Sequence, residues 1–164
     1  MTAEDSRRVS GFVHTPGSQT HQNPHPVRPI SIVVTSDETG GMLGVIDESL
    51  APGEQAPPHI HHAADELLYV LAGEFSFQIG DLRARGGIGT VSFVPRGTVH
   101  TWQNAGDTPG RMLFVFTPAG FEGFIAEGPA RARLELEARE PGTINRMAAR
   151  YQTTYINFPP ASSE

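Results

Sequence analysis

Residues 53–73, GEQAPPHIHHAADELLYVLAG, combine a turn-rich opening, histidines in alternation and a short apolar run that ends at glycine. Similar runs, rich in Val, Phe and Leu and separated by Gly, Pro or Asp, recur on both sides of it: PISIVVT, MLGVIDE, FSFQI, GTVSFVP, TVHTWQN and RMLFVFT. Short apolar or alternating runs between turn signals are typical of antiparallel sandwiches and barrels. The sequence therefore predicts an all-β core.

The chain has 164 residues, which is the usual size of one domain. Residues 1–28 are expected to form a polar N-terminal arm, a candidate for flexibility, with solvated histidines such as His14. The β-barrel is expected over residues 29–118, with residues 119–164 forming a C-terminal segment that packs on it. In that segment FEGFIAEG and TINRMAARY have helical spacing, whereas ARARLELEARE mixes strand-like alternation with good helix formers and stays unassigned.

Composition excludes several kinds of chemistry. The chain has no cysteine and no lysine, which removes thiolate nucleophiles, iron–sulfur clusters and Schiff-base lysines. A net charge of -6 offers no basic surface for nucleic acid or anionic lipid. The first residues, MTAEDSRRVS, lack an apolar signal segment, and no apolar run reaches the roughly 18 residues of a membrane span. We expect a cytoplasmic protein whose partner is a small molecule rather than nucleic acid or membrane.

Four of the seven histidines fall in the predicted β core. In a strand, His59 and His61 project to one face and His62 to the other. Glu66 follows a short linker, where a bend could return its carboxylate to the same cavity, and His100 could complete the set from a distant strand. Three imidazoles and a carboxylate suit divalent Fe, Mn, Co, Ni, Cu or Zn better than Ca or Mg. Taken alone, a histidine on a strand is more often a packed or rim residue, and the HxH pattern has little weight.

Glycines and prolines around these residues complete two spaced patterns. They are G-x5-H-x-H-x4-E-x6-G from Gly53 to Gly73 and G-x5-P-x-G-x2-H-x3-N from Gly89 to Asn104. Over roughly residues 40–117 the chain therefore resembles a single-domain cupin, and its C-terminal layout is similar to small quercetinase-like cupins. The resemblance implies a double-stranded β-helix, or jelly-roll barrel, with short C-terminal helices. It also implies that one divalent transition metal lies inside the barrel, held by His59, His61, Glu66 and His100.

The quercetinase-like resemblance implies a metal-dependent dioxygenase in which Glu66 either stays a metal ligand or takes a substrate proton as general base. Alternation along the strands gives a candidate substrate pocket of seven apolar residues: Leu68, Val70, Phe75, Phe77, Trp102, Phe114 and Phe116. Residues 113, 115 and 117 are the alternative inward set on the last strand. Filled barrel interiors are also apolar, so core packing is the commoner role for such side chains. We expect a flavonol-like, enolisable aromatic or polyketide-like substrate.

Fold does not fix chemistry, so two alternatives stay open. One is a non-oxidative metal-dependent enzyme of secondary metabolism, namely an isomerase, cyclase or decarboxylase. The other is a non-catalytic cupin that only binds a ligand. Because small cupins commonly pair, the resemblance also implies a homodimer, and the segment from Ile30 to Thr35 offers a strand that could cross to a partner's sheet.

Overall fold

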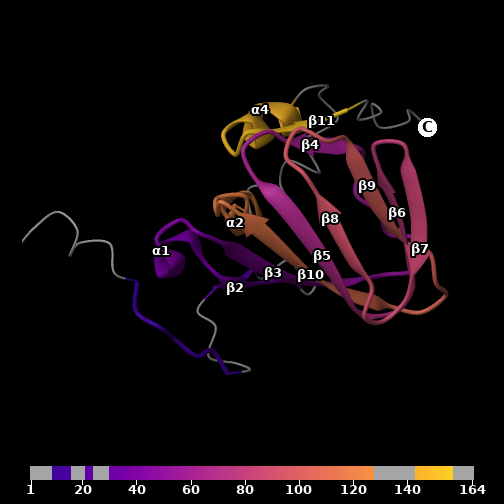
Figure 1. The fold of residues 1–164 in the computed structure, drawn as a ribbon, viewed down its shortest axis with the longest axis horizontal. Helices are drawn as coiled ribbons and strands as arrows, with labels where there is room; N and C mark the ends of the chain where they lie inside the picture. The colour runs from indigo at the N-terminus through magenta and orange to yellow at the C-terminus, as the bar shows by residue number, and fades with distance from the viewer. Residues whose placement is uncertain (1–8, 16–20, 24–29, 128–142, 157–164) are drawn as a thin grey trace, which may run out of the picture.

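A computed structural model describes residues 9–15, 21–23, 30–127 and 143–156, which fold into two facing antiparallel sheets (Figure 1). The first sheet has the order β1-β2-β3-β10-β5-β8: His21–Asn23, Ile30–Val34, Gly44–Leu50, Gly110–Thr117, Asp65–Ala72 and Val91–Val94. The second has the order β11-β4-β9-β6-β7: Thr153–Tyr155, His59–His61, His100–Asn104, Phe75–Ile79 and Leu82–Gly86. The predicted all-β, jelly-roll architecture is confirmed.

The core lies between the two sheets and follows the period of two that strands impose on side chains. On β10, Met112, Phe114 and Phe116 are buried, whereas Leu113 and Val115 are half-buried on the outer face. This settles the inward face of the last strand in favour of the even-numbered set.

Three short helices accompany the sheets within the described residues: α1 (Ser36–Thr39), α2 (Glu122–Ala126) and α4 (Thr143–Ala149). The two C-terminal ones were expected from helical spacing, and they bury Phe124, Ile125 and Ala148. Figure 1 shows α4 and β11 beside β4, at one end of the second sheet. The unassigned ARARLELEARE segment lies outside the described residues. No helix in the ranges that the structure describes is long and apolar enough to cross a membrane.

Sequence reasoning did not find β7, because the segment LRARG is exposed and has only one large apolar residue. Its position is explained by the adjoining turn, in which Gly80 and Asp81 join β6 to β7 as a two-residue hairpin loop. Gly80 has φ 54°, a value that glycine adopts without the steric cost other residues pay. The Gly-Asp pair was therefore the local signal for this strand.

The N-terminal region is more structured than a solvated arm. β1 pairs with β2, and His14 Nε2 lies 2.8 Å from Glu38 Oε1 of α1. The expectation that His14 is solvated was therefore wrong, because this contact leaves its side chain only 22% exposed. The segment predicted to cross to a partner, Ile30 to Thr35, contains β2, which pairs within its own chain with β1 on one side and β3 on the other. Homodimer formation and the domain boundaries stay predictions.

Candidate metal centre

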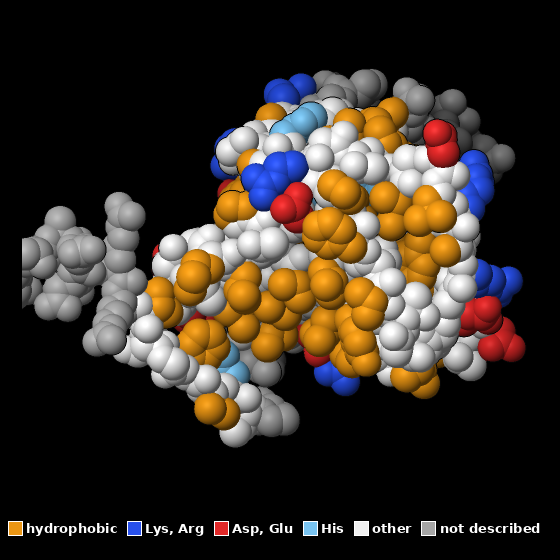
Figure 2. Space-filling model, in the orientation of Figure 1, with side chains coloured by type: hydrophobic (Ala, Val, Ile, Leu, Met, Phe, Trp, Pro, Cys, Tyr) orange, Lys and Arg blue, Asp and Glu red, His pale blue; other side chains and the backbone are white. Residues whose placement is uncertain are grey.

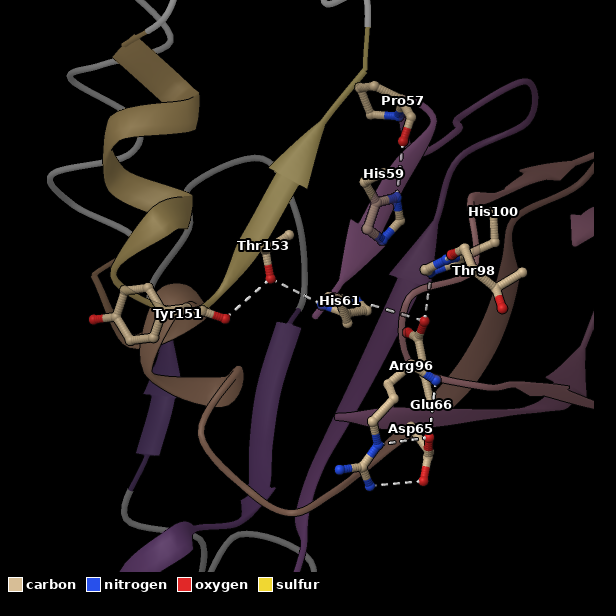
Figure 3. Close-up of polar contacts among 10 residues, drawn as sticks. All are labelled: Pro57, His59, His61, Asp65, Glu66, Arg96, Thr98, His100, Tyr151 and Thr153. Atoms are coloured by element: carbon tan, nitrogen blue, oxygen red, sulfur yellow. Dashed lines mark hydrogen bonds and ion pairs between the residues drawn. The ribbon is translucent and has the colours of Figure 1, made fainter. Parts of the chain in front are cut away.

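Four side chains from three strands converge at one place inside the barrel (Figure 3). His59 and His61 lie on the same face of β4, and His100 begins the neighbouring β9 opposite His59. Glu66 comes from β5 in the facing sheet. The ligand atoms of these four residues all lie within 4.8 Å of one another, and all four residues are buried. His62 is exposed and points away, as the alternation predicted.

The Nδ1 atom of each histidine in the cluster faces a hydrogen-bond acceptor. His59 Nδ1 lies 2.8 Å from the carbonyl oxygen of Pro57, and His100 Nδ1 lies 3.0 Å from that of Thr98. Because a carbonyl oxygen can only accept, both rings carry a proton on Nδ1. Each ring therefore turns Nε2 toward the centre of the cluster.

The third ring is fixed by a side chain rather than by the backbone. His61 Nδ1 lies 2.9 Å from Thr153 Oγ1, and that hydroxyl donates its single proton to the carbonyl oxygen of Tyr151 at 3.1 Å (Figure 3). The hydroxyl can then only accept from His61, so this ring also carries its proton on Nδ1. Hydrogen bonds that fix the tautomer and orientation of a histidine are the usual support for a metal ligand.

The atoms that face the centre have no hydrogen-bond partner. His61 Nε2, His100 Nε2 and Glu66 Oε2 are buried without one, although Glu66 Oε2 lies 2.8 Å from His100 Nε2 and 3.6 Å from His61 Nε2. Buried polar atoms at this spacing need either a proton or a cation between them. The residues therefore fit a divalent transition metal, which three imidazoles and one carboxylate could hold.

Burial and contact with the Glu66 carboxylate shift the pKa values of the clustered histidines in opposite directions. Burial, reinforced by the other histidines, lowers the pKa of His59 to about 3, and burial lowers the pKa of His61 to about 4 despite the Glu66 carboxylate. For His100, burial acts in the same direction, but contact with the Glu66 carboxylate outweighs it and raises the pKa. Burial would raise the pKa of Glu66, but the close contact with His100 and the charges of the histidines lower it. Two neutral rings and one carboxylate are thus ready to bind a cation.

Comparison with known proteins agrees with this geometry. Residues 47–116 match the cupin domain family. The fold is similar to that of an uncharacterised Klebsiella pneumoniae protein with a double-stranded β-helix domain, with a TM-score of 0.53 and 18% identity over 68% of this chain and 93% of that one. The chain therefore contains a cupin domain. The four clustered residues are those of its two spaced patterns.

Among curated relatives, this cupin is similar to two Streptomyces proteins. It is 28% identical to Protein SchB of Streptomyces halstedii over 115 residues, covering 70% of this chain and 80% of SchB. It is 35% identical to the tetracenomycin polyketide synthase protein TcmJ of Streptomyces glaucescens over 80 residues. That match covers 49% of this chain and 52% of TcmJ.

Aromatic rings surround the ligands of this cupin. The ring of Tyr155 is stacked on His59 with centroids 5.3 Å apart, and Phe116 and Phe121 lie 5.3 and 4.4 Å from His61. Sequence reasoning did not assign Thr153, Tyr155 or Phe121 to the site. The available signal was the pair of segments after the barrel, TPAGFEGF and the AARYQTTYINFPP tail, which had been interpreted only as C-terminal layout.

All seven residues of the predicted substrate pocket are buried in the core: Leu68, Val70, Phe75, Phe77, Trp102, Phe114 and Phe116. The strand register orders them by distance from the ligands. Phe116 lies opposite Glu66, Phe114 opposite Leu68, and Met112 opposite Val70. Residues near the ligand end are therefore the better candidates to touch a substrate, and a binding role for this set stays a prediction.

Proposed function

We propose that this cupin is a metal-dependent dioxygenase acting on a small flavonol-like, enolisable aromatic or polyketide-like substrate. The observation that carries the proposal is the buried set of three oriented imidazoles and one carboxylate, with ligand atoms within 4.8 Å of one another. A divalent transition metal held by such a set supplies Lewis acidity toward an enolate or phenolate oxygen and has further coordination positions.

The surroundings of the ligands support this substrate class. The side chains next to the histidines are aromatic, namely Phe116, Phe121 and Tyr155, and rings of this kind favour a flat, apolar ligand. Two arginines of the barrel, Arg96 and Arg111, are exposed, and each binds an aspartate of this chain. The printed name of TcmJ connects that relative to a polyketide synthase, and polyketides are rich in enolisable carbonyl groups.

Glu66 is the residue that we assign to proton transfer. Its carboxylate is buried beside His100 and His61, so it can be a ligand or accept the proton of an enol or phenol that enters the cluster. The Glu66→Gln variant keeps the shape of the side chain but removes the base. We expect it to bind metal at saturating concentration while turnover falls by about a hundredfold or more. Metal affinity and turnover that fall by the same factor would instead mean that Glu66 is only a ligand.

A second candidate function is a non-oxidative reaction, namely isomerisation, cyclisation or decarboxylation. The buried carboxylate of Glu66 also favours this non-oxidative function, because proton transfer by Glu66 at an enolisable carbon needs no oxidant. The printed name of TcmJ is equally compatible with a step that folds or tailors a polyketide chain.

One experiment separates these candidates. The apoprotein is loaded in turn with Fe, Mn, Co, Ni, Cu and Zn and incubated with flavonols and aromatic polyketides, with and without oxygen. Oxygen consumption that matches product formation would support the dioxygenase. Product formed equally well without oxygen would replace it with the non-oxidative enzyme. If neither turnover nor metal retention occurs, the protein is a ligand-binding cupin and the proposal is wrong.

A further inference from the structure

The four clustered residues are almost completely buried. His59 is 4% exposed, His61 3%, and both Glu66 and His100 are 2% exposed. A substrate that reaches a metal held by these residues must therefore pass a side chain that moves, because a site covered in this way admits ligands only by local opening. The contacts around the cluster show which side chain that is.

The two sheets close the long sides of the barrel. Neighbouring strands are joined by backbone hydrogen bonds, so a ligand cannot pass between them. In the first sheet, Leu68 and Phe114 are buried on the inner face, next along the strands from Glu66 and Phe116. Figure 2 shows hydrophobic side chains covering the outer face of the same sheet, over β5, β8 and β10. The route to the cluster therefore lies at the ends of the strands.

Half-buried residues contact the ligand histidines at these ends, and they do so in two ways. Pro57 and Thr98 use backbone carbonyl oxygens, which accept from the Nδ1–H of a ligand ring. Moving either residue would remove a hydrogen bond that orients a ligand. Phe121 instead contacts His61 through its ring alone, with centroids 4.4 Å apart and the planes at 70°. Phe121 can therefore move without changing the tautomer of a ligand.

The wall of the cluster is one ring thick at Phe121. Its ring contacts His61, and the residue is only half-buried, so part of it reaches solvent. Phe116 and Phe124, whose ring centroids lie 4.8 and 5.4 Å from that of Phe121, are both fully buried. They line the space behind Phe121. The ring of Phe121 therefore separates His61 from solvent.

The backbone beside this ring is held in place. Glu122 is buried, and its carboxylate accepts from the N–H of Gly120 at 2.7 Å and from the N–H of Ser36 in α1 at 2.8 Å. Gly44 leaves room for this carboxylate, because a Cβ there would clash with it. Next to the ring, Gly120 has open space around the position that a Cβ would take. The moving part is therefore the side chain of Phe121, which has room to rotate outward.

We propose that Phe121 is the gate of the candidate metal centre and sets the width of the ligands that enter it. The inference rests on the proposed function, whose substrate must reach the four clustered residues. When the ring lies against His61, the cluster is closed. When it rotates outward, it opens a passage beside the rings of Phe116 and Phe124. Such a passage favours a flat aromatic phenol or enol, and the size of the side chain at position 121 limits its width.

The first test measures entry rather than turnover. The native chain, Phe121→Ala and Phe121→Trp are loaded with Co²⁺, and stopped-flow absorption follows the binding of 4-nitrocatechol, a flat phenol, and of azide, a small linear anion. We expect 4-nitrocatechol to enter Phe121→Ala about tenfold faster or more, since an open state populated at about 10% or less slows entry by that fraction. Phe121→Trp should slow its entry. Azide should change by less than about twofold, because a narrow ion needs a smaller opening.

Phe93→Ala is the matched control. It removes the same ring from an exposed position of β8, on the outer face of the first sheet, and should leave both rates native. Equal 4-nitrocatechol rates for the native chain and Phe121→Ala would overturn the gate. Equal acceleration of both probes would mean that the ring does not select by width, and would also overturn the proposal. Circular dichroism verifies folding.

A second measurement needs no metal. In the apoproteins, mass spectrometry follows the exchange of the imidazole C2 proton of each histidine with deuterated water. Phe121→Ala should exchange at His61 several times faster than the native chain, whereas Phe93→Ala should not. An unchanged rate at His61 would refute the gate even in a protein that binds metal and consumes oxygen. Faster exchange at His61 in a protein without oxygen consumption would support the gate and count against the proposed dioxygenase.

Discussion

Thr153→Val is the most informative single substitution at the metal centre. It replaces a hydroxyl by a methyl group of similar size, 1% exposed, and so removes the acceptor of His61 Nδ1–H with little change in packing. The orphaned buried N–H costs roughly 1–3 kcal/mol, a cost that the ring avoids by moving its proton to Nε2. In that tautomer the proton points toward Glu66 Oε2, which lies 3.6 Å away, and occupies the position that a metal needs.

The expected loss follows from this competition. Restoring the ligating tautomer costs about the free energy of the lost hydrogen bond, and changes of this kind next to a metal ligand weaken metal affinity by roughly 10–100-fold. This range corresponds to about 1.4–2.8 kcal/mol. Thr153→Ser keeps the hydroxyl and should retain most of the affinity. Thr154→Val is the matched control, because Thr154 Oγ1 lies 2.9 Å from Nε2 of the exposed His62.

In the assay, each apoprotein competes with a chelator for Co²⁺, and the absorption of the protein-bound ion measures how much metal the protein holds. Circular dichroism verifies folding. The competition between the two tautomers of His61 predicts weak binding for Thr153→Val and native binding for Thr153→Ser and Thr154→Val. A Thr153→Val affinity within about twofold of native would refute it. So would an equal loss for Thr154→Val, since that loss would come from the strand rather than from the His61 hydrogen bond.

Three further predictions concern the ligands. The pKa values of His59 and His61, lowered to about 3 and 4, keep both rings neutral from pH 7 to pH 5, whereas His100, whose pKa is raised, is protonated below that pKa. Metal binding below the pKa of His100 should therefore release about one proton. Calorimetry in two buffers counts the protons released, and a count of two or three would contradict this. Because the unfolded chain protonates these same two rings near pH 6.5, the apoprotein should also lose stability as the pH falls from about 6.5 toward 4, observed as a decreasing urea midpoint. His61→Ala should abolish stoichiometric metal binding while His62→Ala leaves it intact, and equal metal contents on elemental analysis would remove His61 from the site.

The barrel could be predicted from the sequence because its signals are local. Gly73 is an example. It has φ 81°, and a Cβ there would lie 2.8 Å from the Cα of Gly110, so any larger residue at this turn would clash with the backbone. Asn104 was expected to fix a turn, and its side chain does so by donating to Thr108 O and accepting from Gly106 N. Alternation along a strand also predicted that His59 and His61 share a face, whereas the full set with Glu66 and His100 was implied by the resemblance that the two spaced patterns carry.

Contacts that depend on residues far apart in the chain could not be predicted in this way. The hydrogen bond between His61 and Thr153 spans 92 positions, and nothing in the short β11 segment marks it as part of a site. The outward face of β10 could not be predicted for a different reason. Its residues alternate with core residues on strands that are apolar throughout, so Leu113 and Val115 could not be separated from their neighbours until the inward register was known.

The C-terminal segment connects these observations to the metal centre. Asn145 of α4 brackets the backbone of Tyr155, donating to its carbonyl at 2.9 Å and accepting from its N–H at 2.6 Å. Tyr155 stacks on His59, and Thr153 orients His61, so one short strand outside the cupin-domain match supports both histidines of β4. The two spaced patterns therefore specify which atoms could hold a metal, whereas the tail sets how rigidly two of them are held. Chains with the same patterns and a different tail should then differ in metal affinity, in the direction that Thr153→Val reveals.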